Sequence, residues 1–159
     1  MSDATRSLQS VTLKRIFEAP IDLVYETWTQ AQHVERWMKC DVQATLEVEN
    51  WLPEVGTRFA TRMVLAGVFD TSGSGRFLEV EPPHLLVYAL DPDPELEVPA
   101  MTVRVEFRDL GGRTELTLTH SGIPTDRLCG IIEGGWTASL AQLQDLLSEP
   151  SLAERAAAS

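Results

Sequence analysis

The 159-residue chain lacks the features that mark nucleic-acid-binding and membrane proteins. Positive charge is scarce, since 13 Lys and Arg stand against 24 Asp and Glu, and the formal net charge is −11. A chain this acidic is repelled by nucleic acid and by anionic membranes, so neither is an expected partner. Its apolar runs are far shorter than the roughly 18 residues of a membrane-spanning helix. The N-terminal MSDATRSLQS contains no apolar stretch of the kind found in secretory signals.

Cysteine and histidine are also few and scattered. Cys40 and Cys129 lie far apart, which favours two reduced thiols in a cytoplasmic protein over a structural disulfide. His33, His84 and His120 show no metal-ligand spacing. Nucleotide-binding and nucleophile-elbow motifs are missing as well. The sequence therefore assigns no catalytic residue, predicts no metal and no cofactor, and favours a protein that is not an enzyme.

What the chain does have is a long amphipathic segment near its end. At 100° per residue its apolar side chains fall within one arc, and they are Leu128, Ile132, Trp136, Leu140, Leu143, Leu146 and Leu147. Start and stop signals at Thr125-Asp126 and Pro150 predict a helix over 126–148. Gly134-Gly135 lies in its middle, where each Gly costs about 1 kcal/mol relative to Ala. Two interpretations stay open: a kink or close packing, and a space left beside Trp136 for a ligand.

The first third of the chain predicts one strand and two short helices. Alternation over residues 10–18 is typical of a half-buried strand. Ile21, Val24, Tyr25 and Trp28 follow at helical spacing, and Thr29 is the expected cap of a second helix that ends at Trp37-Met38.

Nearly every signal from Cys40 to Ser121 is of the β type. Leu110-Gly-Gly-Arg113 predicts a tight hairpin. We interpret the segment Asp70-Thr-Ser-Gly-Ser-Gly75 as a turn, because glycine and serine cluster there. The acidic, proline-rich segment 91–99 is expected to be a solvated loop.

The predicted order is a strand, two short helices, about six strands and one long helix. Hairpin spacing makes the sheet antiparallel, and its apolar face needs the amphipathic helix as a cover. We therefore expect an α+β fold in which a curved antiparallel sheet wraps around the C-terminal helix and leaves an internal cavity. A single domain would span 1–159, with its core at about 10–148 and flexible tails at 1–9 and 150–159.

Short motifs in this order resemble one known superfamily over about Val11–Leu147. They are RIFEAP (15–20), VYETW (24–28), VERW (34–37), VGTRF (55–59), GRFLEVEPPHL (75–85), TELTLTH (114–120) and Gly135-Trp136. The chain resembles the START-like (SRPBCC, Bet v 1-like helix-grip) superfamily, in the branch similar to the activator of heat-shock protein 90 ATPase. The resemblance implies a pocket between sheet and helix. It does not imply one chemistry, because members include lipid and hormone binders, polyketide aromatase/cyclases and co-chaperones.

Candidate ligand-binding residues are the large apolar side chains of the predicted inner faces, together with one titratable group. They are Trp37, Phe59, Met63, Phe69, Phe77, Tyr88, Met101, His120, Gly135 and Trp136, with Trp28 as a further aromatic. Strand parity places His120 on the inner face with Leu116 and Leu118. It can serve as a hydrogen-bonding or proton-transferring group for a ligand, or as a purely structural histidine.

The favoured function is binding of a small hydrophobic ligand, because an apolar pocket needs no catalytic constellation. A polyketide cyclase or aromatase and a co-chaperone or stress-response module remain as alternatives. The corresponding partners are a small hydrophobic molecule or a protein such as a chaperone, and the chain would be a monomer or a homodimer.

Overall fold

The computed structural model describes residues 8–152 and 154. Seven strands form one antiparallel sheet in the order β1-β7-β6-β5-β4-β3-β2. The elements in chain order are β1 (Gln9–Phe17), α1 (Ile21–Thr29), α2 (Ala31–Trp37), β2 (Thr45–Glu49), β3 (Arg58–Leu65), β4 (Phe69–Glu81), β5 (Leu85–Leu90), the 3-10 turn η2 (Pro94–Leu96), β6 (Met101–Asp109), β7 (Thr114–Ile123) and α3 (Asp126–Leu147). The expected α+β helix-grip fold, with two short helices after the first strand, is confirmed.

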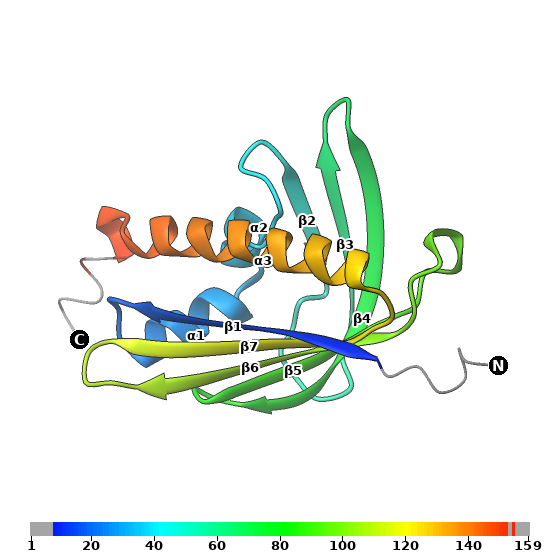
Figure 1. Ribbon diagram of the computed structural model, residues 1–159. Coiled ribbons are helices and arrows are strands. Elements are labelled where there is room, and N and C mark those ends of the chain that lie inside the picture. Colours follow the sequence, from blue (N-terminus) through cyan, green and yellow to red (C-terminus); the bar gives the residue numbers. More distant parts are fainter. Residues whose placement is uncertain (1–7, 153, 155–159) are drawn as a thin grey trace.

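The sheet curls around α3. Figure 1 shows β1, β7, β6 and β5 running beneath the helix, whereas β2, β3 and β4 rise beside its N-terminal part. The β6–β7 hairpin has the predicted tight turn, in which Gly111 and Gly112 both adopt positive φ and the Leu110 amide donates to the Arg113 carbonyl over 2.8 Å. At the β2 edge, the Val48 amide donates to Glu35 of α2 over 2.9 Å, which satisfies one exposed edge group.

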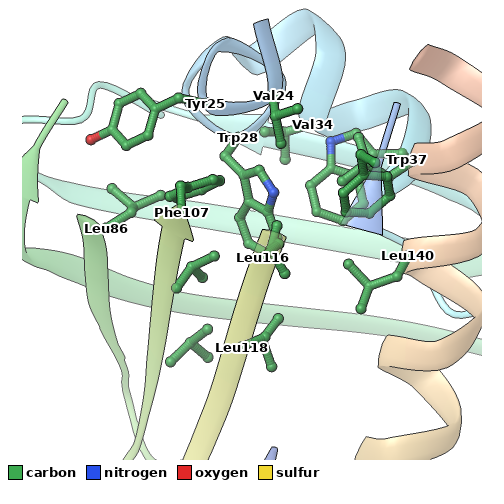
Figure 2. Close-up of a cluster of buried hydrophobic side chains, with 14 of the residues drawn as sticks. Val24, Tyr25, Trp28, Val34, Trp37, Leu86, Phe107, Leu116, Leu118 and Leu140 are labelled. Carbon is green, nitrogen blue, oxygen red and sulfur yellow. The ribbon is translucent and has the colours of Figure 1, made fainter. Parts of the chain in front are cut away.

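The core lies where α1, α2 and the C-terminal half of α3 meet the sheet. Figure 2 shows Trp28 and Trp37 among aliphatic side chains from β5, β7 and α3, with Phe107 of β6 alongside. Trp28 and Trp37 are fully buried, and their rings meet edge to face with centroids 4.6 Å apart. Such burial of large rings is the main stabilising term of a domain of this size.

Two indole groups tie the end of α1 to the rest of the core. The Nε1 of Trp37 donates to the Thr27 carbonyl over 2.8 Å, and the Nε1 of Trp51 donates to the Trp28 carbonyl over 2.9 Å. The last carbonyls of a helix have no partner inside the helix, so these bonds satisfy groups that would otherwise be buried unpaired. They also fix Trp51 against the sheet.

Three local predictions are wrong. The segment 70–75 is not a turn, because β4 runs through it and the chain reverses at 66–68 instead. The second of its two glycines serves close packing: a Cβ on Gly75 would lie 2.0 Å from the Ala89 carbonyl oxygen and 2.7 Å from the Phe59 ring. Thr29 does not cap α2, since its hydroxyl donates back to the Tyr25 carbonyl of α1.

The third correction concerns the predicted C-terminal tail. Residues 150–152 are helical, and Leu152 is only 4% exposed within the core. α3 ends at Leu147, ahead of Pro150, and Pro150 begins a separate short helical segment, a position that proline tolerates well. Burial of the Leu152 side chain holds this segment against the core. At the N-terminal tail, predicted as 1–9, β1 already begins at Gln9. Residues 1–7, 153 and 155–159 of the predicted tails lie outside the described residues.

Candidate functional site

The two halves of α3 differ in how they meet the sheet. Its fully buried residues all lie in the second half, from Ser139 to Leu147. In the first half, the inward-facing Leu128, Ile132 and Trp136 are only partly buried. Thr125 caps the helix by accepting a bond from the Leu128 amide over 3.1 Å. The first half of α3 therefore covers a hollow, whereas the second half completes the core.

That hollow is a cavity of about 260 Å³ between α3, the α2–β2 loop and strands β2, β3, β5 and β7. Its walls are mostly apolar. They are formed by Met38, Cys40, Leu46, Trp51, Phe59, Thr61, Met63, Tyr88, Leu90, His120, Ile132, Gly135, Trp136 and Ser139. Among the residues that the structure describes, no Lys, Arg, Asp or Glu lines this cavity.

The sheet side of the cavity is an aromatic cluster. Trp51 packs against Phe59 and Tyr88, with ring centroids 4.7 and 5.6 Å apart. Phe77 is the fourth ring of the cluster. Its centroid lies 5.1 Å from that of Trp51, and its side chain is fully buried. Such tilted and edge-to-face packing holds the rings in place, so the wall is preformed.

Gly135 lines the cavity from α3. A Cβ at Gly135 would lie 3.7 Å from the Cβ of Cys40, an ordinary contact distance. The exposed Cys40 thiol in turn lies 3.6 Å from the sulfur of Met63 on β3. The Lys39 carbonyl accepts bonds from Ser139 and Gln142, over 2.9 and 2.8 Å, which fasten this loop to α3. Helix, loop and strand thus meet at this part of the cavity wall.

His120 and Trp136 form a fixed polar pair in the wall. The indole Nε1 of Trp136 donates to His120 Nδ1 over 3.0 Å. Because an indole N–H can only donate, His120 is neutral and carries its proton on Nε2, which points to the sulfur of Met101 at 3.3 Å. Burial lowers the pKa of His120 to about 4. Trp136 also stacks on Trp28 at a centroid distance of 5.9 Å, so its ring is held from two sides.

Six of the ten predicted site residues line this cavity: Phe59, Met63, Tyr88, His120, Gly135 and Trp136. The other four lie elsewhere. Trp37 is in the packed core and Phe77 lies behind the aromatic cluster. Met101 contacts His120, and Phe69 lies at the start of β4, outside the described lining.

The sequence reasoning missed Trp51, Met38 and Cys40, among others. Trp51 precedes Pro53 in a segment that the pattern marks as a loop, and its position depends on the bond to the Trp28 carbonyl. Met38 and Cys40 lie just after α2, and only the attachment of Lys39 to α3 brings them to the cavity. Such long-range contacts leave no periodic signal in the sequence.

The cavity wall offers few groups that could bind a metal ion or transfer a proton. Within residues 8–152 and 154, no cluster of three His, Cys, Asp or Glu side chains could hold a metal ion. Its one titratable base, His120, has Nδ1 occupied and stays neutral at physiological pH.

In the described part of the chain, no helix is long and apolar enough to span a membrane.

Comparison with known proteins gives one matching family and solved structures of similar fold. The family model described as Activator of Hsp90 ATPase homolog 1-like protein matches residues 18–148. None of the curated proteins matches the chain. A crystal structure of a protein from Chromobacterium violaceum superposes with a TM-score of 0.77 at 22% identity, covering 88% of this chain and 98% of that one.

Two further solved structures are similar to this chain. The AHSA1 protein of Silicibacter pomeroyi has a TM-score of 0.76 at 18% identity, covering 88% of this chain and 98% of its own. CalU16 from Micromonospora echinospora has a TM-score of 0.67 at 23% identity, covering 92% of this chain and 80% of its own. At these identities the similarity demonstrates a shared fold.

Proposed function

The chain belongs to the family of Activator of Hsp90 ATPase homolog 1-like proteins, and we propose that it binds a small hydrophobic molecule in the cavity beneath the first half of α3. One observation carries the proposal: the helix residues above the cavity are only partly buried, although they belong to the apolar arc of α3. A folded chain gains by filling such space with its own side chains. Here Gly135 and the partly buried Ile132 leave it open instead.

The two alternatives receive less support from the site. A cyclase would need an acid or base in contact with its substrate, and a histidine with a pKa of about 4 is a poor general acid at neutral pH. A co-chaperone role draws on the family's description and on the acidic net charge, neither of which involves the cavity. We place the protein in the cytoplasm, where the exposed thiol of Cys40 stays reduced.

The experiment compares two neighbouring glycines of α3. Gly135 faces the cavity, whereas a Cβ at the exposed Gly134 would meet nothing within 4 Å. Replacing either by Leu raises helix propensity by a similar amount, so neither variant should unfold. We expect Gly135→Leu to block the cavity and Gly134→Leu to leave it open.

Binding is measured with the neutral, environment-sensitive fluorophore 6-acetyl-2-dimethylaminonaphthalene. Wild type and Gly134→Leu should give a blue-shifted, saturable signal, and Gly135→Leu should reduce affinity at least about tenfold. Absence of binding to wild type would overturn the proposal. Equal binding by both variants would show that the probe sits elsewhere.

A further inference from the structure

Tyr88 is the buried polar group of the cavity that has the weakest partner. Its side chain lines the cavity and the residue is 3% exposed. The hydroxyl has a methionine as its partner, with Oη lying 4.0 Å from the sulfur of Met38. A thioether is a weak acceptor, and this separation is long even for sulfur.

Tyr88 and His120 belong to one row across the concave face. Register pairs His120 of β7 with Val103 of β6, and Val103 with Tyr88 of β5. Directly paired residues share a face, so both polar groups face α3, about 10 Å apart at their Cα atoms by strand spacing. The row continues to Phe77 of β4. Tyr88 and His120 thus line the same cavity from the same face of the sheet.

Methionine sulfur is the partner of three donors around this site. His120 Nε2 meets Met101 at 3.3 Å, and the Cys40 thiol meets Met63 at 3.6 Å. The Tyr88 pair completes the set. The other two donors are better placed than the Tyr88 hydroxyl. His120 Nε2 lies closer to its sulfur, at 3.3 Å against 4.0 Å for Tyr88, and Cys40 is exposed to solvent. Tyr88 is therefore the donor with most to gain from a better acceptor.

Met38 can yield this position at little cost. Its side chain is unbranched, lines the same cavity and is only partly buried. Methionine adapts readily to a new neighbour. A ligand oxygen could therefore take the place of the sulfur next to the Tyr88 hydroxyl without disturbing the fold.

The electrostatics of the cavity restrict the charge of the ligand. No cationic side chain among the described residues lines the cavity, and His120 is neutral. Burial raises the pKa of Tyr88, so the hydroxyl keeps its proton and acts as a donor. A carboxylate placed here would be a buried charge without a counter-charge, which is strongly unfavourable.

The volume of the cavity restricts the size of the ligand. With about 30 Å³ per water molecule, the 260 Å³ cavity has room for about nine waters. That volume suits a ligand of one or two fused rings.

From these observations we propose that the cavity is selective for a small, neutral, ring-containing molecule with a hydrogen-bond acceptor such as a ketone oxygen, and that Tyr88 is the residue that recognises this acceptor. This inference rests on the proposed function, because it names the ligand class of the same cavity.

Three probes of nearly identical shape test it. 2-Acetylnaphthalene carries a neutral acceptor, 2-isopropenylnaphthalene replaces its oxygen by a CH₂ group, and 2-naphthoate carries a charge. Dissociation constants are measured at pH 8 by isothermal titration calorimetry. Wild type should bind the ketone about threefold to tenfold more tightly than the hydrocarbon. The carboxylate should bind at least about a hundredfold more weakly than the ketone.

Two matched variants assign the effect to one hydroxyl. Tyr88→Phe should remove the preference for the ketone and leave the affinity for the hydrocarbon unchanged. Tyr25→Phe is the control, since Tyr25 is also buried but its hydroxyl donates to the Leu85 carbonyl over 3.0 Å, away from this cavity. That variant should keep the preference of wild type.

Each result has a distinct meaning. Equal binding of ketone and hydrocarbon to wild type, or a ketone preference that survives in Tyr88→Phe, overturns the inference but not the proposed function. Tight binding of 2-naphthoate overturns the requirement for a neutral ligand. If wild type binds none of the probes, the proposed function and the inference both fail.

Discussion

The unequal packing of the two halves of α3 gives a quantitative prediction for stability. Leu143 is fully buried, whereas Ile132 is partly buried and borders the cavity. Mutation of either residue to Ala removes three carbon atoms, which are worth about 0.8 kcal/mol each when fully buried. Leu143→Ala also creates a new void and should cost about 3–4 kcal/mol. Ile132→Ala only enlarges an existing hollow, and we expect a loss of about 1 kcal/mol.

Urea-induced unfolding at equilibrium measures both losses, and equal m values for all variants validate the comparison. Gln144→Ala is the control, because Gln144 lies on the exposed face of α3 and its loss should change stability by less than about 0.5 kcal/mol. Equal costs for Ile132→Ala and Leu143→Ala would refute the reasoning, because the first half of α3 would then be packed as tightly as the second.

Two further predictions concern the cavity wall. Burial lowers the pKa of His120 from 6.5 to about 4, so its contribution to stability is complete above pH 6.5 and is lost, by about 3 kcal/mol, as the pH falls toward 4. His120→Gln should flatten this part of the pH profile of unfolding, and an unchanged profile would contradict the assignment. Gly75→Ala should destabilise by about 3 kcal/mol or more, because its Cβ would overlap the Ala89 carbonyl. Gly73→Ala on the same strand meets only the Thr61 hydroxyl at 3.3 Å and should cost less than half as much in the same assay.

Periodicity predicted most of the fold because the patterns of its elements are local. The apolar arc of α3 and the Gly111-Gly112 hairpin both appear where the sequence placed them. Composition gave the wrong prediction for residues 70–75, because clustered glycine and serine are typical of turns. Gly75 instead makes room for the Phe59 ring and the neighbouring strand, and that requirement depends on a residue distant in sequence.

The sequence pattern could predict which side chains face the inside of the fold, but not which of them line the cavity. Parity placed His120 on the inner face, and His120 lines the cavity. The hydrophobic pattern could not separate the cavity wall from the packed core, so Trp37 and Phe77 were included although both are fully buried. That distinction depends on how far α3 lies from each strand, which is a property of tertiary packing.

The central claim is that a small neutral molecule enters the space between the sheet and the first half of α3. The most direct test follows the four tryptophan indole N–H signals in ¹H–¹⁵N NMR spectra while 2-acetylnaphthalene is added, after each signal has been assigned by a Trp→Phe variant. Trp51 and Trp136 line the cavity and should shift with a common dissociation constant. Trp37, whose Nε1 is held by the Thr27 carbonyl in the packed core, should not move. Unchanged signals for Trp51 and Trp136 at saturating probe, or a shift of Trp37 alone, would contradict the account.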